Sequence, residues 1–270
     1  MADSASGAPV LYDVRKHAAW ITLNTPHNHN ALSLELCTAL DESVAKALSD
    51  PGVRTLVLTG VGKTFCAGAD LKSGGGGAAR GGDAVRGGGG SDARRSRFVS
   101  SIEKLWNAPK PVVGRFQGNA FGGGLGLMAA CDIGIAVDGC RYAFTEVRLG
   151  LMPAIISVFV LRKMSLADAT PYFLTGDRFT AAQAQAMRLV QRVVPEAELD
   201  AAVERVLDSL REGGPLALQE CKQLLRRIPL LSVSDGLEFA EKRIGELFAS
   251  AEGQEGMAAF AAKRKPNWVP

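Results

Sequence analysis

Glu146 is the residue in this sequence best suited to acid–base chemistry. It lies among apolar neighbours in the segment YAFTEVRLGLMP, residues 142–153. Apolar surroundings disfavour the ionised form of a carboxyl group and raise its pKa, which is what a general acid or base working near neutral pH requires. A single glutamate is more often a solvated surface residue. Glu146 is therefore a candidate whose partners must come from other segments.

A second segment, TLVLTGVGKTFCAGADL at residues 55–71, contains Gly62-Lys63-Thr64, which resembles the end of a nucleotide-binding loop. Such a loop needs a glycine five residues before its Gly-Lys-Thr and a helix directly after it. The required glycine position holds Val57, and the small residues after Thr64 favour a tight bend. A phosphate site is therefore not predicted here.

Three consecutive glycines at residues 122–124 precede a predicted helix. Without side chains, the backbone of such a stretch lets a ligand approach the exposed N–H groups of the first helical turn. Close packing of the helix against a strand would require the same residues. The triplet by itself leaves both interpretations open.

These segments are positioned by an alternation of strands and helices. Alternating polar and apolar residues over 10–25 predict a hairpin that turns near Lys16 and His17. Ser33 offers an N-cap for a helix that ends before Pro51. Further strands are predicted at 54–59, 112–115, 133–137 and 190–194, with helices at 123–131 and after Thr180. This alternation indicates an α/β fold with a parallel sheet.

After Pro195 the sequence shows only amphipathic helical patterns. We therefore predict two regions, a core at 1–195 and a helical C-terminal region at 196–270. Residues 73–95 hold ten glycines and almost no apolar side chain, so we expect a mobile loop there. The loop is interpreted either as a linker or as a lid over a site.

Composition excludes several classes of function. The 270 residues are 47% apolar, which suffices for one domain with a smaller appendage. The net charge is only +3 and the basic clusters are short and dispersed, so no nucleic-acid partner is expected. Five widely spaced cysteines without a C-x-x-C pair suggest neither disulfides nor a metal site. No signal peptide or membrane span is indicated, and a cytoplasmic location is expected.

Several motifs together resemble the crotonase superfamily, the enoyl-CoA hydratases and isomerases, over essentially the whole chain. They are Asn24-Thr25-Pro26, Asn30-Ala31-Leu32, Phe65-Cys66-Ala67-Gly68-Ala69-Asp70-Leu71, Lys110-Pro111-Val112, the glycine triplet through Cys131-Asp132-Ile133, Leu174-Thr175-Gly176, and Phe260 with Lys263-Arg264-Lys265-Pro266. The resemblance implies a spiral of repeated β-β-α units with a helical C-terminal trimerisation region. It also implies that the N–H groups of Ala69 and Gly123 form an oxyanion hole for an acyl-CoA thioester, with Glu146 as acid/base.

The resemblance further implies which residues contact the substrate. The coenzyme A part would lie along the bend at Ala67, Ala69, Asp70, Leu71 and Lys72, with His29 beside its phosphates. Gly122 and Gly126 belong to the same binding set, and Phe260 and Lys263 match positions that reach the coenzyme A of a neighbouring subunit. A homotrimer, or a hexamer made of two trimers, is expected. Coenzyme A arrives with the substrate, and no separate cofactor is implied.

One position departs from the family pattern. Well-studied hydratases of this family carry two glutamates, and here the first is replaced by Gly126. We expect hydration of a 2-enoyl-CoA, with branched or carboxylated acyl groups among the candidate substrates, because the sequence looks most like hydratases of the methylglutaconyl-CoA type. Room for a β-branch beside Gly126 is part of this hypothesis. The alternatives are a single-glutamate enoyl-CoA isomerase and a catalytically inactive acyl-CoA-binding protein.

Overall fold

The computed structural model describes residues 7–70 and 97–269. The predicted mobile loop at 73–95 lies outside these residues. The chain divides into two compact units, one made of Met1–Ala108 and Val112–Val203 and the other of Pro109–Pro111 and Glu204–Pro270. The predicted division into regions 1–195 and 196–270 stays a prediction. Within the described ranges, no helix is both long and apolar enough to cross a membrane.

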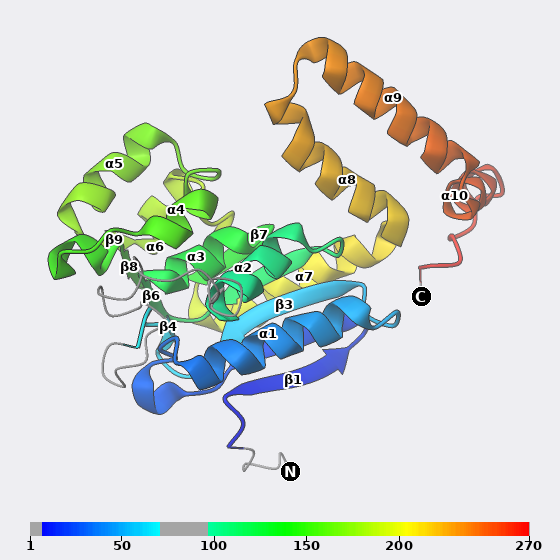
Figure 1. The fold of residues 1–270 in the computed structure, drawn as a ribbon. Coiled ribbons are helices and arrows are strands. Elements are labelled where there is room, and N and C mark those ends of the chain that lie inside the picture. Colours follow the sequence, from blue (N-terminus) through cyan, green and yellow to red (C-terminus); the bar gives the residue numbers. More distant parts are fainter. Residues whose placement is uncertain (1–6, 71–96, 270) are drawn as a thin grey trace, which may run out of the picture. The chain divides into compact units, whose positions relative to one another are not determined.

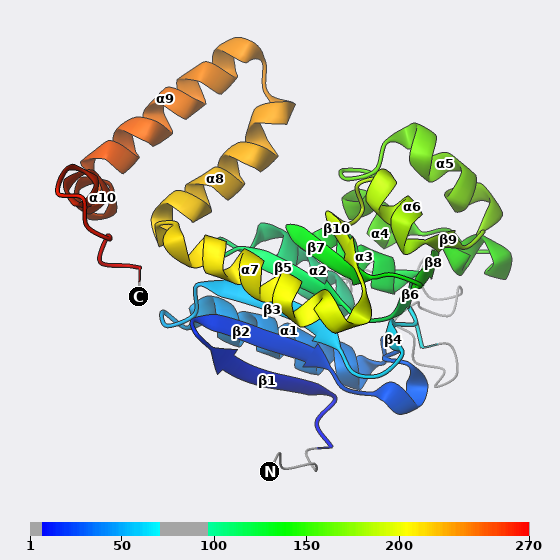
Figure 2. The ribbon, with the colours of Figure 1, turned by 180° about the vertical axis from the view of Figure 1, so that it is seen from behind.

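A six-stranded sheet forms the centre of the first unit (Figures 1 and 2). Its first two strands are an antiparallel hairpin whose turn residues Lys16 and His17 have positive φ, as the sequence predicts. The other neighbours in the sheet pair in parallel. In spatial order the strands are β1 (Val10–Arg15), β2 (Ala18–Leu23), β3 (Thr55–Gly60), β5 (Val112–Phe116), β7 (Ile133–Val137) and β10 (Arg192–Val194).

A second sheet of four short strands was not predicted. In spatial order it contains β4 (Thr64–Cys66), β6 (Asn119–Phe121), β8 (Arg141–Ala143) and β9 (Phe179–Thr180). Strands β4, β6 and β8 are parallel, and β9 is antiparallel to β8. Strands of two or three residues are too short to show a sequence period, and tertiary pairing alone defines them.

The two sheets are built from repeated β-β-α units, as expected. Strands β3 and β4 precede α2 (Arg97–Asn107), β5 and β6 precede α3 (Gly123–Ala130), and β7 and β8 precede α4 (Ala154–Val160). In each unit the first strand joins the large sheet and the second joins the small one. Each of these repeats therefore adds one strand to the large sheet and one strand to the small sheet.

Helices cover one face of the large sheet, whose strands stand in front of α1, α2 and α3 in Figure 2. Helix α1 (Leu34–Ser49) begins where predicted, because the Ser33 hydroxyl accepts a hydrogen bond from the Leu36 N–H at 3.1 Å. Between the sheets, the rings of Phe65 and Phe116 pack edge to face at 4.9 Å, and both side chains are fully buried. This contact joins β4 to β5.

The remaining elements are helical. In the first unit these are the short helices η1 (Pro26–Asn28) and η3 (Thr145–Leu149), with α5 (Leu166–Thr175) and α6 (Ala181–Ala186). Thr180 and Gln183 form a capping box at the start of α6, as the sequence indicates. A short helix, η4 (Glu196–Glu198), and α7 (Leu199–Glu212) follow, and the second unit holds α8 (Pro215–Arg227), η5 (Ile228–Leu230), α9 (Val233–Ala249) and α10 (Ala251–Ala261). From Glu196 to Val269 the chain has no strand, which confirms the predicted change of character.

Within the second unit, acidic side chains join the helices. The Glu252 carboxylate accepts hydrogen bonds from the N–H groups of Leu216 at 2.9 Å and Ala217 at 2.8 Å, and so caps α8. Buried Glu220 on α8 pairs with Arg243 on α9. These contacts hold three helices together in a unit with little apolar core of its own.

Candidate active site

Three segments of the site follow three neighbouring strands of the small sheet. Residues 67–69 come directly after β4, residues 122–123 after β6, and residues 144–146 after β8. The strands are parallel, with Cys66 paired to Ala120 and Phe121 paired to Ala143. Carboxyl ends of parallel strands meet at the same edge of a sheet, which is where ligands of α/β proteins bind. The fold therefore brings Ala69, Gly123 and Glu146 to one edge.

The first two segments are in van der Waals contact through Gly68. This residue has φ +84°, and a Cβ built on it would lie 2.8 Å from the Phe121 carbonyl oxygen and 3.4 Å from the Gly123 nitrogen. Any side chain would collide with the neighbouring backbone, so glycine is required for both conformation and space. Gly68 was not among the predicted site residues, although its place in the bend marked it as special.

The N–H groups of Ala69 and Gly123 have no acceptor among residues 7–70 and 97–269. Their surroundings are nonetheless fixed. Ala69 forms an isolated parallel bridge with Leu32, whose N–H donates to the Gly68 carbonyl at 2.8 Å. Gly123 is the first residue of α3, where N–H groups are unpaired and the helix dipole is positive. Two fixed donors on adjoining segments are what an oxyanion site needs.

The Glu146 carboxyl group lies beside the second of these segments. A Cβ built on Gly122 would be 3.1 Å from Glu146 Oε1, and Gly122 itself has φ +49°. The Gly122 N–H donates to the Ala143 carbonyl at 3.0 Å, which ties the glycine segment to β8. Only glycine at position 122 allows the carboxyl group to approach this closely.

Glu146 also has the electrostatic environment expected of an acid/base. It lies in the first turn of η3, and its Oε2 atom is buried without a hydrogen-bond partner among the described residues. Burial raises the pKa of this carboxyl group above its ordinary value, and a hydrogen bond with its own backbone opposes the shift only in part. The group therefore holds and releases protons closer to neutral pH than a solvated glutamate.

The predicted coenzyme A residues lie partly beside this edge. The Ala67 N–H donates to the His29 carbonyl at 3.1 Å, so His29 and the bend are neighbours. His29 is exposed, and Asp70 follows Ala69 directly. Leu71 and Lys72 lie outside the described residues. Contact of these residues with coenzyme A stays a prediction.

Asn30 is a positioning residue. The sequence analysis quoted it in a motif but gave it no functional role. Its side chain is fully buried and accepts a hydrogen bond from the Thr25 N–H at 2.8 Å. Its Nδ2 donates to the carbonyl groups of Val61 at 3.0 Å and Thr64 at 2.9 Å. Asn30 thus fixes the segment that carries His29 to the start of β4. Asn30 has positive φ, which asparagine tolerates better than most residues, so the asparagine in the Asn30-Ala31-Leu32 motif was the available signal.

The space expected beside Gly126 is filled, so that part of the sequence hypothesis is wrong. A Cβ built on Gly126 would overlap the Ile156 side chain and lie 2.9 Å from Ile156 Cβ and 3.1 Å from Ile102 Cδ1. Both isoleucines are buried. Helix α4 therefore closes on α3 at this point, and Gly126 provides close helix packing, with no room left for a β-branch.

Two further predicted residues belong to the second unit. Phe260 lies on α10 with 87% of its surface exposed, and the Lys263 N–H donates to the Phe260 carbonyl at 3.1 Å. Their predicted contact with a neighbouring subunit's coenzyme A stays a prediction. In the first unit, Arg148 pairs with Asp177 at 2.5 Å and donates to the Thr175 carbonyl.

The described part of the segment at 55–71 shows neither a phosphate loop nor an activated thiol. Thr64–Cys66 is a strand and not a helix start, which agrees with the rejection of a phosphate loop. Burial raises the pKa of the Cys66 thiol to about 12, so the thiol stays protonated at neutral pH. Among the described residues, no group of three or more His, Cys, Asp or Glu side chains has the arrangement of a metal site.

Replacing Glu146 should change how the stability of the protein depends on pH, and the direction of that change reports the direction of the pKa shift. The raised folded-state pKa means that the favourable contribution is complete below the ordinary value of 4.5 and is lost as pH rises through the folded pKa. Glu146→Gln cannot ionise, so its free energy of unfolding relative to wild type should increase from acidic to neutral pH. Urea unfolding across this range measures the difference.

Glu255→Gln is the matched control with the opposite sign. The hydrogen bond from Arg264 lowers the pKa of Glu255 to about 2, so this substitution should be destabilising at neutral pH. A Glu146→Gln difference that is constant with pH, or that falls toward neutral pH, would contradict the assignment of a raised pKa.

Gly126→Ala should destabilise the protein although alanine is the better helix former. The added methyl group overlaps Ile156, and overpacking of this kind costs about 1–3 kcal/mol. Adding Ile156→Ala should make the Gly126→Ala change less costly in a double-mutant cycle measured by urea unfolding. Gly245→Ala on α9, where nothing lies within 4 Å of the new methyl group, is the control and should be neutral or stabilising. If the effects of Gly126→Ala and Ile156→Ala on the free energy of unfolding are simply additive, the packing explanation is wrong.

Comparison with known proteins agrees with this geometry. Residues 14–269 match the enoyl-CoA hydratase/isomerase family. The chain is 32% identical to a putative enoyl-CoA hydratase of Thermus thermophilus, over 93% of this chain and 97% of that protein. It is 29% identical to (E)-benzylidenesuccinyl-CoA hydratase of Thauera aromatica, over 96% and 98% of the two chains. The solved structure of Pseudomonas aeruginosa AtuE is 33% identical and superimposes with a TM-score of 0.87, covering 97% of this chain and 100% of that one. The chain therefore belongs to the enoyl-CoA hydratase/isomerase family.

Proposed function

We propose that the protein adds water to a 2-enoyl-CoA thioester. The observation that carries this proposal is that two N–H groups without an acceptor in the described part of the chain, and one carboxyl group with a buried oxygen, lie at the edge formed by β4, β6 and β8. The N–H groups of Ala69 and Gly123 would bind the thioester oxygen, where one such donor contributes about 3–4 kcal/mol to transition-state stabilisation. Glu146 would act on the adjacent carbons.

In this mechanism Glu146 performs both proton transfers. The carboxylate takes a proton from water as the water oxygen bonds to the β-carbon, and the electron pair of the double bond moves onto the thioester oxygen. The two N–H dipoles stabilise that enolate. The enolate then collapses as Glu146 returns the proton to the α-carbon. One carboxyl group suffices because both transfers take place on one face of the substrate.

Isomerisation is the second candidate, and the packing at Gly126 favours it. Ile156 and Ile102 fill the space beside this position, so α3 presents an apolar contact where a second carboxylate would stand. A single carboxylate is sufficient to remove a proton from the α-carbon of a 3-enoyl thioester and return it to the γ-carbon, which moves the double bond into conjugation. The same oxyanion site would stabilise this intermediate.

Branched or carboxylated acyl groups are the proposed substrate class. Open space beside Gly126 does not support this substrate class, because Ile156 and Ile102 fill that space. Its support is the similarity to the hydratase of Thauera aromatica, which is named for benzylidenesuccinyl-CoA, a thioester of a substituted dicarboxylic acid. Arg148 does not provide the carboxylate partner in this structure, because it pairs with Asp177.

We also propose how the coenzyme A part and the subunits are arranged. Coenzyme A would lie along Ala67, Asp70, Leu71 and Lys72 near His29, and Gly122 would face the acyl group. Phe260 and Lys263 would contact the coenzyme A of a neighbouring subunit in a homotrimer or a pair of trimers. Exposed apolar side chains between η3 and α5, which a monomer would leave in water, support self-association: Leu149, Leu151, Met152, Val158, Leu166 and Leu174. Free cysteines, four of five buried, favour a reducing, cytoplasmic location.

A panel of thioesters tests the proposed reaction. Linear, branched and carboxylated 2-enoyl-CoA and a 3-enoyl-CoA are followed by ultraviolet absorbance of the conjugated thioester and by product mass. We expect loss of absorbance and gain of one water on 2-enoyl substrates. Glu146→Gln should lower kcat about 10²–10⁴-fold, the usual contribution of general acid–base catalysis.

Asp177→Asn, which removes only the exposed pair with Arg148, is the control and should keep kcat. Formation of conjugated product from the 3-enoyl thioester without hydration would establish the isomerase. Thioester binding with no turnover of any substrate would establish the inactive binding protein and refute both reactions.

A further inference from the structure

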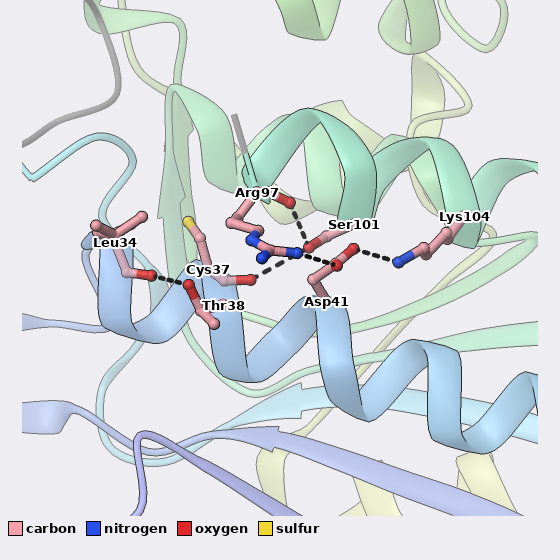
Figure 3. Close-up of polar contacts among 7 residues, drawn as sticks. All are labelled: Leu34, Cys37, Thr38, Asp41, Arg97, Ser101 and Lys104. Atoms are coloured by element: carbon pink, nitrogen blue, oxygen red, sulfur yellow. Dashed lines mark hydrogen bonds and ion pairs between the residues drawn. The ribbon is translucent and has the colours of Figure 1, made fainter. Parts of the chain in front are cut away.

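Asp41 is a buried carboxylate on α1 that binds α2 (Figure 3). Only 3% of its surface is exposed. Its Oδ1 is 2.7 Å from Lys104 Nζ, and its Oδ2 is 3.3 Å from Arg97 Nη1. These two partners stand at opposite ends of α2, and Asp41 lies between them. One carboxylate therefore binds side chains from both the first and the last turn of α2.

Two hydroxyl groups of α2 complete this contact. Ser100 hydrogen-bonds to Asp41, and the Ser101 hydroxyl lies 3.4 Å from the Cys37 carbonyl of α1 while donating to its own helix at Arg97. Burial alone would raise the pKa of Asp41, but the hydrogen bonds from Lys104 and Ser100 outweigh it and hold the pKa below its ordinary value. The carboxylate is therefore ionised at neutral pH and attracts both cations.

The opposite edge of α2 lies against the candidate active site. The Phe98 ring is 3.5 Å from the position that a Cβ on Gly123 would occupy, and Ile102 Cδ1 is 3.1 Å from the corresponding position on Gly126. Phe98 and Ile102 are one helical turn apart and share this edge. The helix thus places Phe98 beside Gly123, which would bind the thioester oxygen, and Ile102 beside Gly126, three residues further along α3.

We propose that Asp41 is a positioning residue that sets how wide an acyl group the site accepts. By holding α2 to α1, it keeps Phe98 beside Gly123 and Ile102 beside Gly126. The α- and β-carbons of a thioester bound at the Gly123 N–H lie next to its carbonyl, so these side chains limit branching there. This inference rests on the proposed binding of acyl-CoA at Ala69 and Gly123.

The affinities of two saturated thioesters measure this effect without requiring turnover. Isothermal titration calorimetry gives the Kd of butanoyl-CoA and of 3-methylbutanoyl-CoA, and their ratio reports the tolerance of a β-branch. Asp41→Asn should shift the ratio toward the branched ligand by about threefold to tenfold, the range expected for a residue that acts through its neighbours. Phe98→Ala should shift it in the same direction, and the double variant should shift it by less than the product of the two effects.

Thr180→Ala, which removes the capping box of α6, is the control for simple loss of stability. It should lower Tm and leave the ratio unchanged. If Asp41→Asn lowers Tm but keeps the wild-type ratio, Asp41 only stabilises the fold and the inference is wrong. If Asp41→Asn does not fold, the same Kd ratio is measured for Lys104→Met, which keeps the ion pair between Asp41 and Arg97. A wild-type ratio in that variant would overturn the inference.

Failure of the proposed function gives a different result. A wild-type protein that binds neither thioester contradicts the acyl-CoA site itself and overturns both proposals. A wild-type protein that binds both thioesters, with a ratio that no Asp41 or Lys104 variant changes, overturns only the role of Asp41.

Discussion

Parallel pairing of β4, β6 and β8 is the constraint on which the rest of the site depends. Each strand has only three residues, yet the segments that follow them carry Ala69, Gly123 and Glu146. Because the strands are parallel and adjacent, these segments leave the sheet at one edge. Each of the three strands directly follows a strand of the large sheet, β3, β5 or β7, so the chain connects the site to the centre of the fold at three points.

Close approach at two glycines is the second requirement. At Gly68, the Phe121 carbonyl and the Gly123 nitrogen lie where a side chain would otherwise stand. At Gly122, the Glu146 carboxyl group takes that position. The surrounding segments are fixed by hydrogen bonds, such as Leu32 to Gly68 and Gly122 to Ala143, while the N–H groups of Ala69 and Gly123 have no acceptor in the part of the chain that the structure describes. Donors held in place before a ligand binds need no reorganisation during reaction, which is the usual source of oxyanion stabilisation.

Sequence reasoning succeeded where local signals are strong. The hairpin at 10–25 was predicted because its residues alternate, α1 because Ser33 caps it, and β7 because an apolar run at 133–137 continues the alternation of strands and helices. The small sheet was missed because three-residue strands carry no period. The packing at Gly126 was also missed, because a glycine in a helix does not show which distant side chain fills its space. Ile156 lies thirty residues away and was visible only once α4 was placed on α3. Family resemblance supplied the roles of Ala69, Gly123 and Glu146, which local pattern alone did not.

The central claim is that the Ala69 and Gly123 N–H groups together polarise the carbonyl group of a bound thioester. Difference infrared spectroscopy of an enoyl-CoA labelled with ¹³C at the thioester carbonyl measures this directly. Two hydrogen bonds from fixed donors should move the carbonyl stretch of the bound thioester to a lower frequency than in water. A stretch at the frequency found in water, with the thioester bound, would contradict the account.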